Sequence, residues 1–318
     1  MKRLLVTAGG TAIAWHIAEI IRKYFQNQVE LHISDINDAY LIPASVIAKK
    51  VHKVPLTMDP QYVEAIKKII TDEKIDIVIP LIPYEGILFA KDSEFIKELN
   101  IKTTTATMEV TKLLSDKFNL YNTLKNIGVP TPELYDINKV QDDVAYLLKP
   151  RLGFGSVGIT KVMGCDLKKN KMSFDLANNV ISQYCHDTDY DEVTVEVYNG
   201  KSGLHIFTRR RIATKAGVCV KMEPVNNEIF FPYVKKLVKT IQCPLAFNVQ
   251  FLFHNSEWKL FDCNLRLGAG TALSTTVGFQ LTRALIAELL DKKVEEQLFK
   301  VDTTIKSVLR VYQEIAIR

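Results

Sequence analysis

The sequence predicts a parallel α/β domain at the start of the chain and an α+β remainder built on antiparallel sheet. Two patterns predict this: the opening third alternates short apolar runs with helix-period segments, and the later part carries closely spaced alternating runs that suit hairpins. The length of 318 residues also exceeds what one hydrophobic core usually supports. We therefore expect two or three domains around a shared cleft.

The chain opens with a strand, a glycine turn and a helix. An apolar run over residues 3–8 ends in Gly9-Gly10-Thr11, and a helix-period segment over residues 14–25 follows. The next elements are expected as strands over residues 29–36 and 75–82 and an amphipathic helix over residues 62–70. Strands that alternate with helices indicate a parallel sheet, so this half is Rossmann-like.

The glycine turn has two interpretations. A glycine turn at a helix N-terminus can hold a pyrophosphate, and Asp35 near the end of the second strand could reach a ribose hydroxyl. The segment GGTAIA, however, lacks the third glycine of a dinucleotide fingerprint. A turn that only packs is therefore favoured over NAD binding.

The character of the sequence changes near residue 110. A helical segment ends at Gly128, and the following VPTP cannot continue a helix. Beyond it we expect a helix over residues 231–240 and strands over residues 145–149, 158–162, 193–198, 204–208, 247–253 and 258–263. The predicted domains are residues 1–110, 111–186 and 187–318.

Bulk composition argues against several classes of protein. Apolar residues make up 47% and charged residues 24%, as in ordinary globular proteins. The 41 basic and 36 acidic side chains leave a formal charge of +5 without the basic stripe of a nucleic-acid-binding protein. No apolar run approaches the roughly 20 residues that span a bilayer. Five cysteines without metal-ligand spacing indicate reduced thiols, so a cytoplasmic location is expected.

The segment LLKPRLGFGSVGITKV places Lys149 at the end of an apolar strand, before a glycine-rich loop. Glycines let backbone N–H groups approach an anion closely, and the lysine supplies a positive charge. Because the lysine precedes the glycines and no helix follows, this is not the phosphate loop of P-loop NTPases. Taken alone, the segment suits a phosphate site and a solvated hairpin tip equally well.

A second polar cluster lies in FNVQFLFHNSEWKLFDCNLRLGAGT, where two strands form a hairpin. Gln250 lies on the first strand, and Asp262, Asn264 and Arg266 alternate along the second and so share one face. Oxygen donors on adjacent strands suit Mg²⁺, and an arginine beside it would stabilise charge in phosphoryl transfer. The alternative is a solvated polar face.

A third segment, ISQYCHDTDYDEVTVEVY, lies between these two. Backbone groups around Tyr184 and Cys185 could pair with an adenine edge, and Glu192 could accept hydrogen bonds from ribose hydroxyls. This evidence is weak when taken alone.

In their order along the chain these features resemble the ATP-grasp superfamily, in particular its carbamoyl phosphate synthetase and biotin carboxylase branch. SDKFNLYNTLKNIGVPTP, with Lys117, resembles the first helix of the grasp, and LLKPRLGFGSVG resembles its lysine strand and glycine flap. Gln183 to Cys185 resembles the adenine hinge, EVTVEV the ribose-binding strand, and NVQF with LFDCNLRLGAG the magnesium and arginine strands. The opening half resembles the pre-ATP-grasp domain, so the resemblance covers essentially the whole chain.

The resemblance implies a ligase that phosphorylates a carboxylate with ATP and lets an amine or related nucleophile displace phosphate from the acyl phosphate. Its cofactors would be ATP and Mg²⁺, or Mn²⁺, and its partner a small carboxylate. The matching positions are Lys117, Lys149, Gly153, Gly155, Ser156, Gly158, Gln183, Tyr184, Cys185 and Glu192 for ATP, Gln250, Asp262 and Asn264 for the metal, and Arg266, Lys149 and Arg211 for catalysis. Asp262 and Gln183 depart from the family, which commonly has glutamate there.

Two further expectations concern the acceptor carboxylate. The run Arg209-Arg210-Arg211 falls where such enzymes gather substrate groups, so Arg211 is expected to contact the carboxylate or the acyl phosphate. For Arg209 and Arg210 a solvated strand face is an equal alternative. Glu85, which follows the strand over residues 75–82, is expected to line the cleft.

Three other functions stay open. An ATP-binding sensor without turnover would need no catalytic arginine, so the intact Arg266 argues against it. A carbamoyl phosphate synthetase-like half-subunit would need a partner subunit, since the chain has one grasp half and no internal repeat. An NAD oxidoreductase would use the first domain. The identity of the carboxylate is not predicted, and a homodimer is the commonest arrangement.

Overall fold

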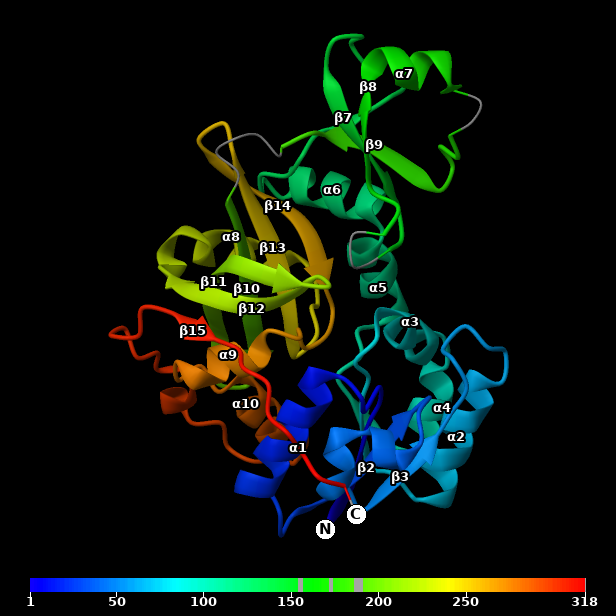
Figure 1. Cartoon of the computed structure of the whole chain (residues 1–318), viewed down its shortest axis with the longest axis vertical. Helices are drawn as coiled ribbons and strands as arrows, with labels where there is room; N and C mark the ends of the chain where they lie inside the picture. Colours follow the sequence, from blue (N-terminus) through cyan, green and yellow to red (C-terminus); the bar gives the residue numbers. More distant parts are fainter. Residues whose placement is uncertain (154–156, 172–173, 186–190, 318) are drawn as a thin grey trace.

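In a computed structural model of the chain, the described residues are 1–153, 157–171, 174–185 and 191–317. Within these residues the strands form a five-stranded, a four-stranded and a six-stranded sheet (Figure 1). None of the helices they contain is both long and apolar enough to cross a membrane. All five cysteines are free.

The N-terminal sheet is entirely parallel, with the strand order β3-β2-β1-β4-β5. Its strands are β1 (Lys2–Val6), β2 (Val29–Asp35), β3 (Lys50–Lys53), β4 (Ile77–Ile79) and β5 (Lys102–Thr103), and its helices are α1 (Ala12–Tyr24), α2 (Tyr62–Asp72), α3 (Pro83–Lys91) and α4 (Ser93–Glu98). This confirms the predicted α/β half. The strand expected over residues 75–82 ends at Ile79, because Pro80 has no N–H and Pro83 starts α3.

The glycine turn after β1 packs against its own domain. A Cβ on Gly9 would lie 2.0 Å from Ile33 Cγ2, so only glycine fits there. The Gly10 N–H donates to Asp35 Oδ2 at 2.8 Å, and the Asn37 backbone and side-chain N–H groups donate to Asp35 Oδ1 at 2.9 Å. Because both oxygens of Asp35 are engaged inside the turn, the geometry supports the packing interpretation.

The remainder of the chain is antiparallel, as predicted. The small sheet has the order β6-β9-β7-β8 and the large sheet β14-β13-β10-β11-β12-β15. Their strands are β6 (Leu134–Tyr135), β7 (Ala145–Pro150), β8 (Thr160–Met163), β9 (Asn179–Gln183), β10 (Asp191–Gly200), β11 (Gly203–Lys215), β12 (Val218–Val225), β13 (Ala246–His254), β14 (Glu257–Asn264) and β15 (Val308–Leu309). The helices are α5 (Met108–Ser115), α6 (Lys117–Asn126), α7 (Gly164–Lys169), α8 (Phe231–Thr240), α9 (Thr271–Thr276) and α10 (Leu281–Leu289).

The sequence predicted two domain boundaries. The one near residue 110 falls within α5, and the one at residues 186–187 lies outside the described residues. The expected helix over residues 231–240 is α8, and the expected last hairpin is β13–β14, whose turn residues Asn255 and Ser256 both have positive φ.

The large sheet has one apolar and one polar face. On β10, Val193, Val195 and Val197 are fully buried in a cluster that includes Leu237 of α8 and Phe251 of β13. Because side chains alternate along a strand, the residues between these valines point to the opposite face. That face carries the candidate site.

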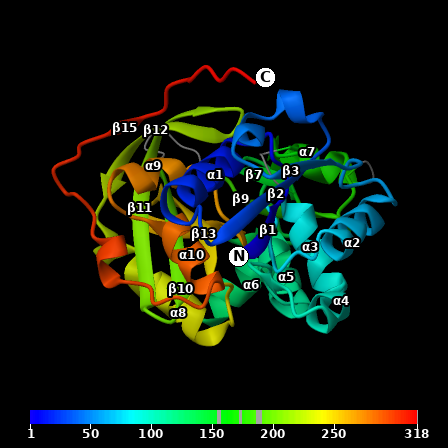
Figure 2. The same cartoon turned by 90° about the horizontal axis from the view of Figure 1, so that it is seen from below.

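The N-terminal domain packs on the large-sheet region through α1. Ile13 and Ile17 of α1 belong to one buried cluster with Leu273 of α9 and Leu285 of α10. Figure 2 shows α1 beside α9 and α10, in agreement with the contacts between these helices. The two halves therefore share a core.

Candidate functional site

The polar face of the large sheet brings acids, amides and arginines together. Strand register pairs Thr194 with Arg209 and with Gln250, and Gln250 with Asp262. Since residues paired across strands point to the same side of a sheet, these side chains share one surface.

A cavity of about 710 Å³ lies between this surface and the small sheet. Most of the predicted site residues line it, namely Lys117, Lys149, Gly153, Tyr184, Glu192, Arg211, Gln250, Asp262, Asn264 and Arg266. They come from both antiparallel sheets and from α6. Its volume suits a small-molecule ligand, since such sites hold about 300–1,000 Å³.

Lys149 is buried at the end of β7, with 3% of its surface exposed. Its Nζ lies 3.3 Å from the Tyr121 hydroxyl and within 6 Å of the ring centroids of Tyr121 and Phe261, at 5.7 and 5.9 Å. Among the described residues no carboxylate forms an ion pair with it. Burial, with the nearby charge of Lys117, lowers the pKa of Lys149 to about 8. A buried ammonium without an ion pair favours an anionic ligand.

Lys117 begins α6 beside the glycine flap. Its Nζ donates to the Gly153 carbonyl at 3.4 Å, and its backbone N–H donates to the Arg151 carbonyl at 2.9 Å. Asp116 caps the helix by accepting from the Phe118 N–H at 2.8 Å and also pairs with Arg151 at 2.8 Å. The helix start and the flap start are thus held together.

The flap itself is described only at its two ends. Gly158 has a φ of +76°, and a Cβ there would lie 2.9 Å from Pro150 Cγ, so this position favours glycine. Gly155 and Ser156 lie outside the described residues.

The three predicted metal ligands lie together on β13 and β14. Asn264 Nδ2 donates to Asp262 Oδ2 at 3.0 Å, and Gln250 Nε2 donates to Glu192 Oε1 at 2.9 Å. With their nitrogens used as donors, both amides keep their oxygens for a cation. One carboxylate and two amide oxygens fit Mg²⁺, which takes its remaining ligands from phosphate and water. No group of three or more His, Cys, Asp or Glu side chains within the described ranges could hold a metal alone.

Arg266 follows β14 and is partly buried. Its Nη1 donates to the Leu267 carbonyl at 3.1 Å, and burial lowers the pKa of its guanidinium from the usual value. Asn248 Nδ2 donates to the Arg266 carbonyl at 3.1 Å and so fixes its backbone. Arg266 lines the same cavity as the three predicted metal ligands.

Arg211 and Glu192 lie side by side on the polar face of the large sheet. The Arg211 guanidinium forms an ion pair with Glu192 Oε1 and also donates to the Gly217 carbonyl at 2.9 Å. A nucleotide ribose at Glu192 would therefore lie beside Arg211.

The predicted hinge residues have different surroundings. Tyr184 lines the cavity, and Lys161 Nζ lies 4.1 Å from its ring centroid. The Gln183 side chain instead faces the β13–β14 hairpin, where Lys259 Nζ donates to its Oε1 at 2.8 Å. Cys185 is buried. Of the three predicted hinge residues, Tyr184 is the one that lines the cavity.

A smaller cavity of about 70 Å³ adjoins the large one. Its walls come from the start of α3, from α5 and from the end of β14, and include Tyr84, Ile87 and Thr111. Four residues line both cavities: Gly153, Asp262, Asn264 and Arg266. Asp262, Asn264 and Arg266 therefore lie where the two cavities meet.

The expectation that Glu85 lines the cleft is wrong. Glu85 is 1% exposed, and its carboxylate accepts hydrogen bonds from the Thr7 and Tyr62 hydroxyls and from the Leu81 and Ile82 N–H groups. Such a fully satisfied carboxylate holds β1, α2 and the start of α3 together. Its role is structural.

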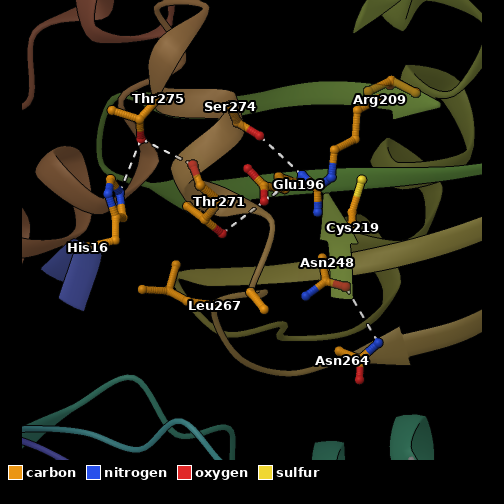
Figure 3. A network of polar contacts seen from close by, with 12 residues as sticks. His16, Glu196, Arg209, Cys219, Asn248, Asn264, Leu267, Thr271, Ser274 and Thr275 are labelled. Atoms are coloured by element: carbon orange, nitrogen blue, oxygen red, sulfur yellow. Dashed lines mark hydrogen bonds and ion pairs between the residues drawn. The ribbon is translucent and has the colours of Figure 1, made fainter. Parts of the chain in front are cut away.

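A solvated strand face for Arg209 is also wrong. Arg209 is 3% exposed and Glu196 0%, and their Nη1 and Oε1 atoms lie 2.6 Å apart. Figure 3 shows this pair under the start of α9, where Thr271 Oγ1 donates to Glu196 at 2.8 Å and Arg209 donates to Ser274 Oγ at 3.1 Å. A Cβ on Gly270 would lie 2.5 Å from Arg209 Nη2. The arginine side chain therefore packs directly against the glycine loop that follows Arg266.

Sequence reasoning missed Glu196, Thr194 and Asn248, although a signal was present. In EVTVEV and NVQF these polar residues occupy every second position, in phase with Glu192 and Gln250. The same alternation that identified the predicted residues places the missed ones on the cavity face.

Two protein families match the chain. The family described as PylC-like, N-terminal domain matches residues 4–104. The family described as ATP-grasp in the biosynthetic pathway with Ter operon matches residues 185–312, which include Arg266 and the three predicted metal ligands.

Curated relatives are distant. The carbamoyl phosphate synthase large chain of Thermoplasma acidophilum is 22% identical, over 89% of this chain and 30% of its own length. The carbamoyl-phosphate synthase of Methanobrevibacter smithii is 26% identical, over 68% of this chain and 64% of its own length. The chain thus covers less than two thirds of either relative.

Solved structures share the fold. The biotin carboxylase domain of Hydrogenobacter thermophilus 2-oxoglutarate carboxylase, in complex with MgADP, ADP and bicarbonate, has a TM-score of 0.77 at 14% identity, covering 95% of this chain and 72% of that one. The L-amino acid ligase of Bacillus licheniformis has a TM-score of 0.68 at 12% identity, covering 95% and 78%.

Proposed function

The chain is an ATP-grasp protein with a PylC-like N-terminal domain, and on that basis we propose that it is a ligase activating a small carboxylate on Mg-ATP. The carboxylate oxygen attacks the γ-phosphorus, the bond to the β–γ bridging oxygen breaks and ADP leaves. An amine or related nucleophile then attacks the acyl carbon, loses a proton to solvent and displaces inorganic phosphate. The acyl group and the nucleophile are left undefined.

The observation that carries this proposal is the meeting of two cavities at Asp262, Asn264 and Arg266. The larger cavity has the volume and the buried cations that ATP needs. The smaller cavity reaches the same residues from the side of the N-terminal domain, and the acceptor carboxylate would bind there. A phosphoryl group leaving ATP would then move past Arg266 toward the acceptor.

The proposed roles follow from the surroundings of each residue. Lys149 and Lys117 would contact the ATP phosphates, because a buried ammonium gains most from an anion. Asp262, Asn264 and Gln250 would hold magnesium, which when bound neutralises phosphate charge. Arg266 would stabilise the charge of the transferring phosphoryl group, so catalysis would rest on positioning and electrostatics.

The test is a screen for acceptor-dependent ADP release. The protein is incubated with ATP, Mg²⁺ and pools of amino acids and carboxylic acids, with hydroxylamine added to trap an acyl phosphate as a hydroxamate. We expect release with at least one pool, and its loss in Arg266→Met but not in the matched surface variant Lys125→Gln. No release with any pool would overturn the proposal, and ATP-induced thermal stabilisation without turnover would favour a sensor.

A narrower second candidate is a carbamoyl phosphate synthetase-like half-subunit, which the curated relatives favour. It predicts bicarbonate as the acceptor and a requirement for a partner subunit. Bicarbonate therefore belongs in the screen. ADP release with bicarbonate alone would favour this candidate over a carboxylate–amine ligase.

A further inference from the structure

A separate cavity of about 570 Å³ lies between the end of α1, α10 and the chain after α10. Among the residues that the structure describes, it shares no lining residue with the two cavities of the candidate site. Tyr24 contributes from α1, Arg283 from α10, and Lys292 and Lys300 from the following segment. Its volume lies within the range of about 300–1,000 Å³ that small-molecule sites occupy.

The wall of this cavity is cationic. Arg283, Lys292, Lys293 and Lys300 line it against a single carboxylate, that of Glu295. Glu295 lies 3.6 Å from Lys293, which leaves the other three cations without an ion pair among the residues that the structure describes. A concave surface lined by one sign of charge concentrates ions of the opposite sign.

Arg283 is held in place by an aromatic ring rather than by an acid. Its guanidinium carbon lies 4.0 Å from the centroid of the Tyr24 ring. This cation–π contact restrains the guanidinium and leaves its N–H groups for an oxyanion. The cation is therefore positioned before any ligand arrives.

The same wall contains two buried amide oxygens that lack a hydrogen-bond partner, Gln28 Oε1 and Gln280 Oε1. The Gln280 amide is oriented by its Nε2, which donates to the Thr275 carbonyl at 3.0 Å. A buried acceptor requires a donor, and the described protein atoms supply none to either oxygen. Both oxygens are enclosed by protein atoms behind the cavity wall, so the groups that a ligand in the cavity would meet are the cations.

We propose that this cavity binds a small polyanion, with phosphate as the anionic group. The lysines would act as point charges and Arg283 as the bidentate contact. This site is independent of the proposed ligase activity, because none of its residues belongs to that machinery. Its test therefore needs no turnover.

The experiment measures binding of tripolyphosphate by calorimetry, without divalent cations and at about 50 mM salt. All chains carry Lys149→Met, which weakens the candidate ATP cavity. Lys292→Gln with Lys300→Gln tests the proposed site, and Lys125→Gln with Lys139→Gln removes equal charge from exposed positions elsewhere. Since all four lysines are exposed, the variants are expected to keep the parent's circular dichroism and melting temperature.

We expect one tripolyphosphate per Lys149→Met chain, about tenfold weaker binding in the site variant, and less than a twofold change in the control variant. Absence of binding to the Lys149→Met chain, or equal weakening in both double variants, would overturn the proposal. A changed sedimentation coefficient in the site variant, with unchanged binding, would assign this surface to self-association and overturn it as well.

Discussion

The two walls of the large cavity bury their cations in opposite ways. Lys149, on the small sheet, contacts a hydroxyl and two aromatic rings. Arg209, on the large sheet, is as deeply buried but lies 2.6 Å from the carboxylate of Glu196 and also donates to Ser274. Both residues line the same space.

This difference indicates which of the two buried positive charges is available to bind an anionic ligand. The charge of Arg209 is neutralised by Glu196. The role of Arg209 is therefore to hold the glycine loop and α9 against the large sheet. The charge of Lys149 is not neutralised, which is why burial lowers its pKa. An anion such as a nucleotide phosphate would remove that penalty.

The largest effect is expected in stability. Arg209→Met leaves Glu196 buried without a counter-charge, which costs about 3–5 kcal/mol of unfolding free energy. Arg210→Met on the same strand removes a partly exposed cation and should cost less than about 1 kcal/mol. Lys149→Met should cost little, because it removes an uncompensated buried charge. Urea denaturation measures all three, and equal losses in Arg209→Met and Lys149→Met would contradict the comparison.

The second effect is on nucleotide affinity. Lys149→Met should weaken Mg-ATP binding by about 10–100-fold, since hydrogen bonds to charged groups contribute about 1.5–3 kcal/mol. Lys125→Gln, which removes an exposed charge of α6, serves as the matched control and should leave affinity unchanged. Calorimetry with Mg-ATP checks this. Unaltered affinity in Lys149→Met would show that the buried ammonium does not contact the nucleotide.

The third effect is on the metal dependence of binding. Asp262 provides the only carboxylate among the three proposed metal ligands, so Asp262→Asn should weaken Mg-ATP binding about tenfold. ATP binding in EDTA should be the same in both proteins. An equal loss with and without magnesium would indicate a role for Asp262 other than holding the cation.

The last effect is a pH dependence. Lys149 has a pKa of about 8 in the folded chain, below its unfolded value of about 10.4. Between these values the unfolded chain binds more protons, so stability without ligand should rise as pH increases from about 8 to 10. Mg-ATP affinity should fall over the same window, because binding must restore the proton. Lys149→Met should show neither trend, and a wild-type protein without them would contradict the assigned pKa.

The sequence allowed prediction of those site residues that a local pattern specifies. Strand alternation placed Gln250, Asp262 and Asn264 on one face, and the glycine-rich loop identified Lys149. The strands were predicted less completely. For example, β12 was not predicted, because Lys221, Glu223 and Pro224 interrupt its apolar pattern.

Partners distant in the chain could not be predicted. Whether Arg209 is buried depends on Glu196 and on Ser274 of α9, which no local pattern connects to it. Glu85 follows a strand in the same way as many cleft residues, and only the positions of Thr7 and Tyr62 make it structural. In each case the deciding contact spans residues far apart in sequence.

The central claim is phosphoryl transfer to a carboxylate at the junction of the two cavities. Once the screen has found an acceptor, the most direct test supplies that acid with ¹⁸O in its carboxylate and analyses the released inorganic phosphate by mass spectrometry. The proposed route predicts one ¹⁸O atom in each phosphate, because the acyl oxygen that attacks ATP leaves with phosphorus. Phosphate that carries oxygen only from ATP and water would contradict the claim.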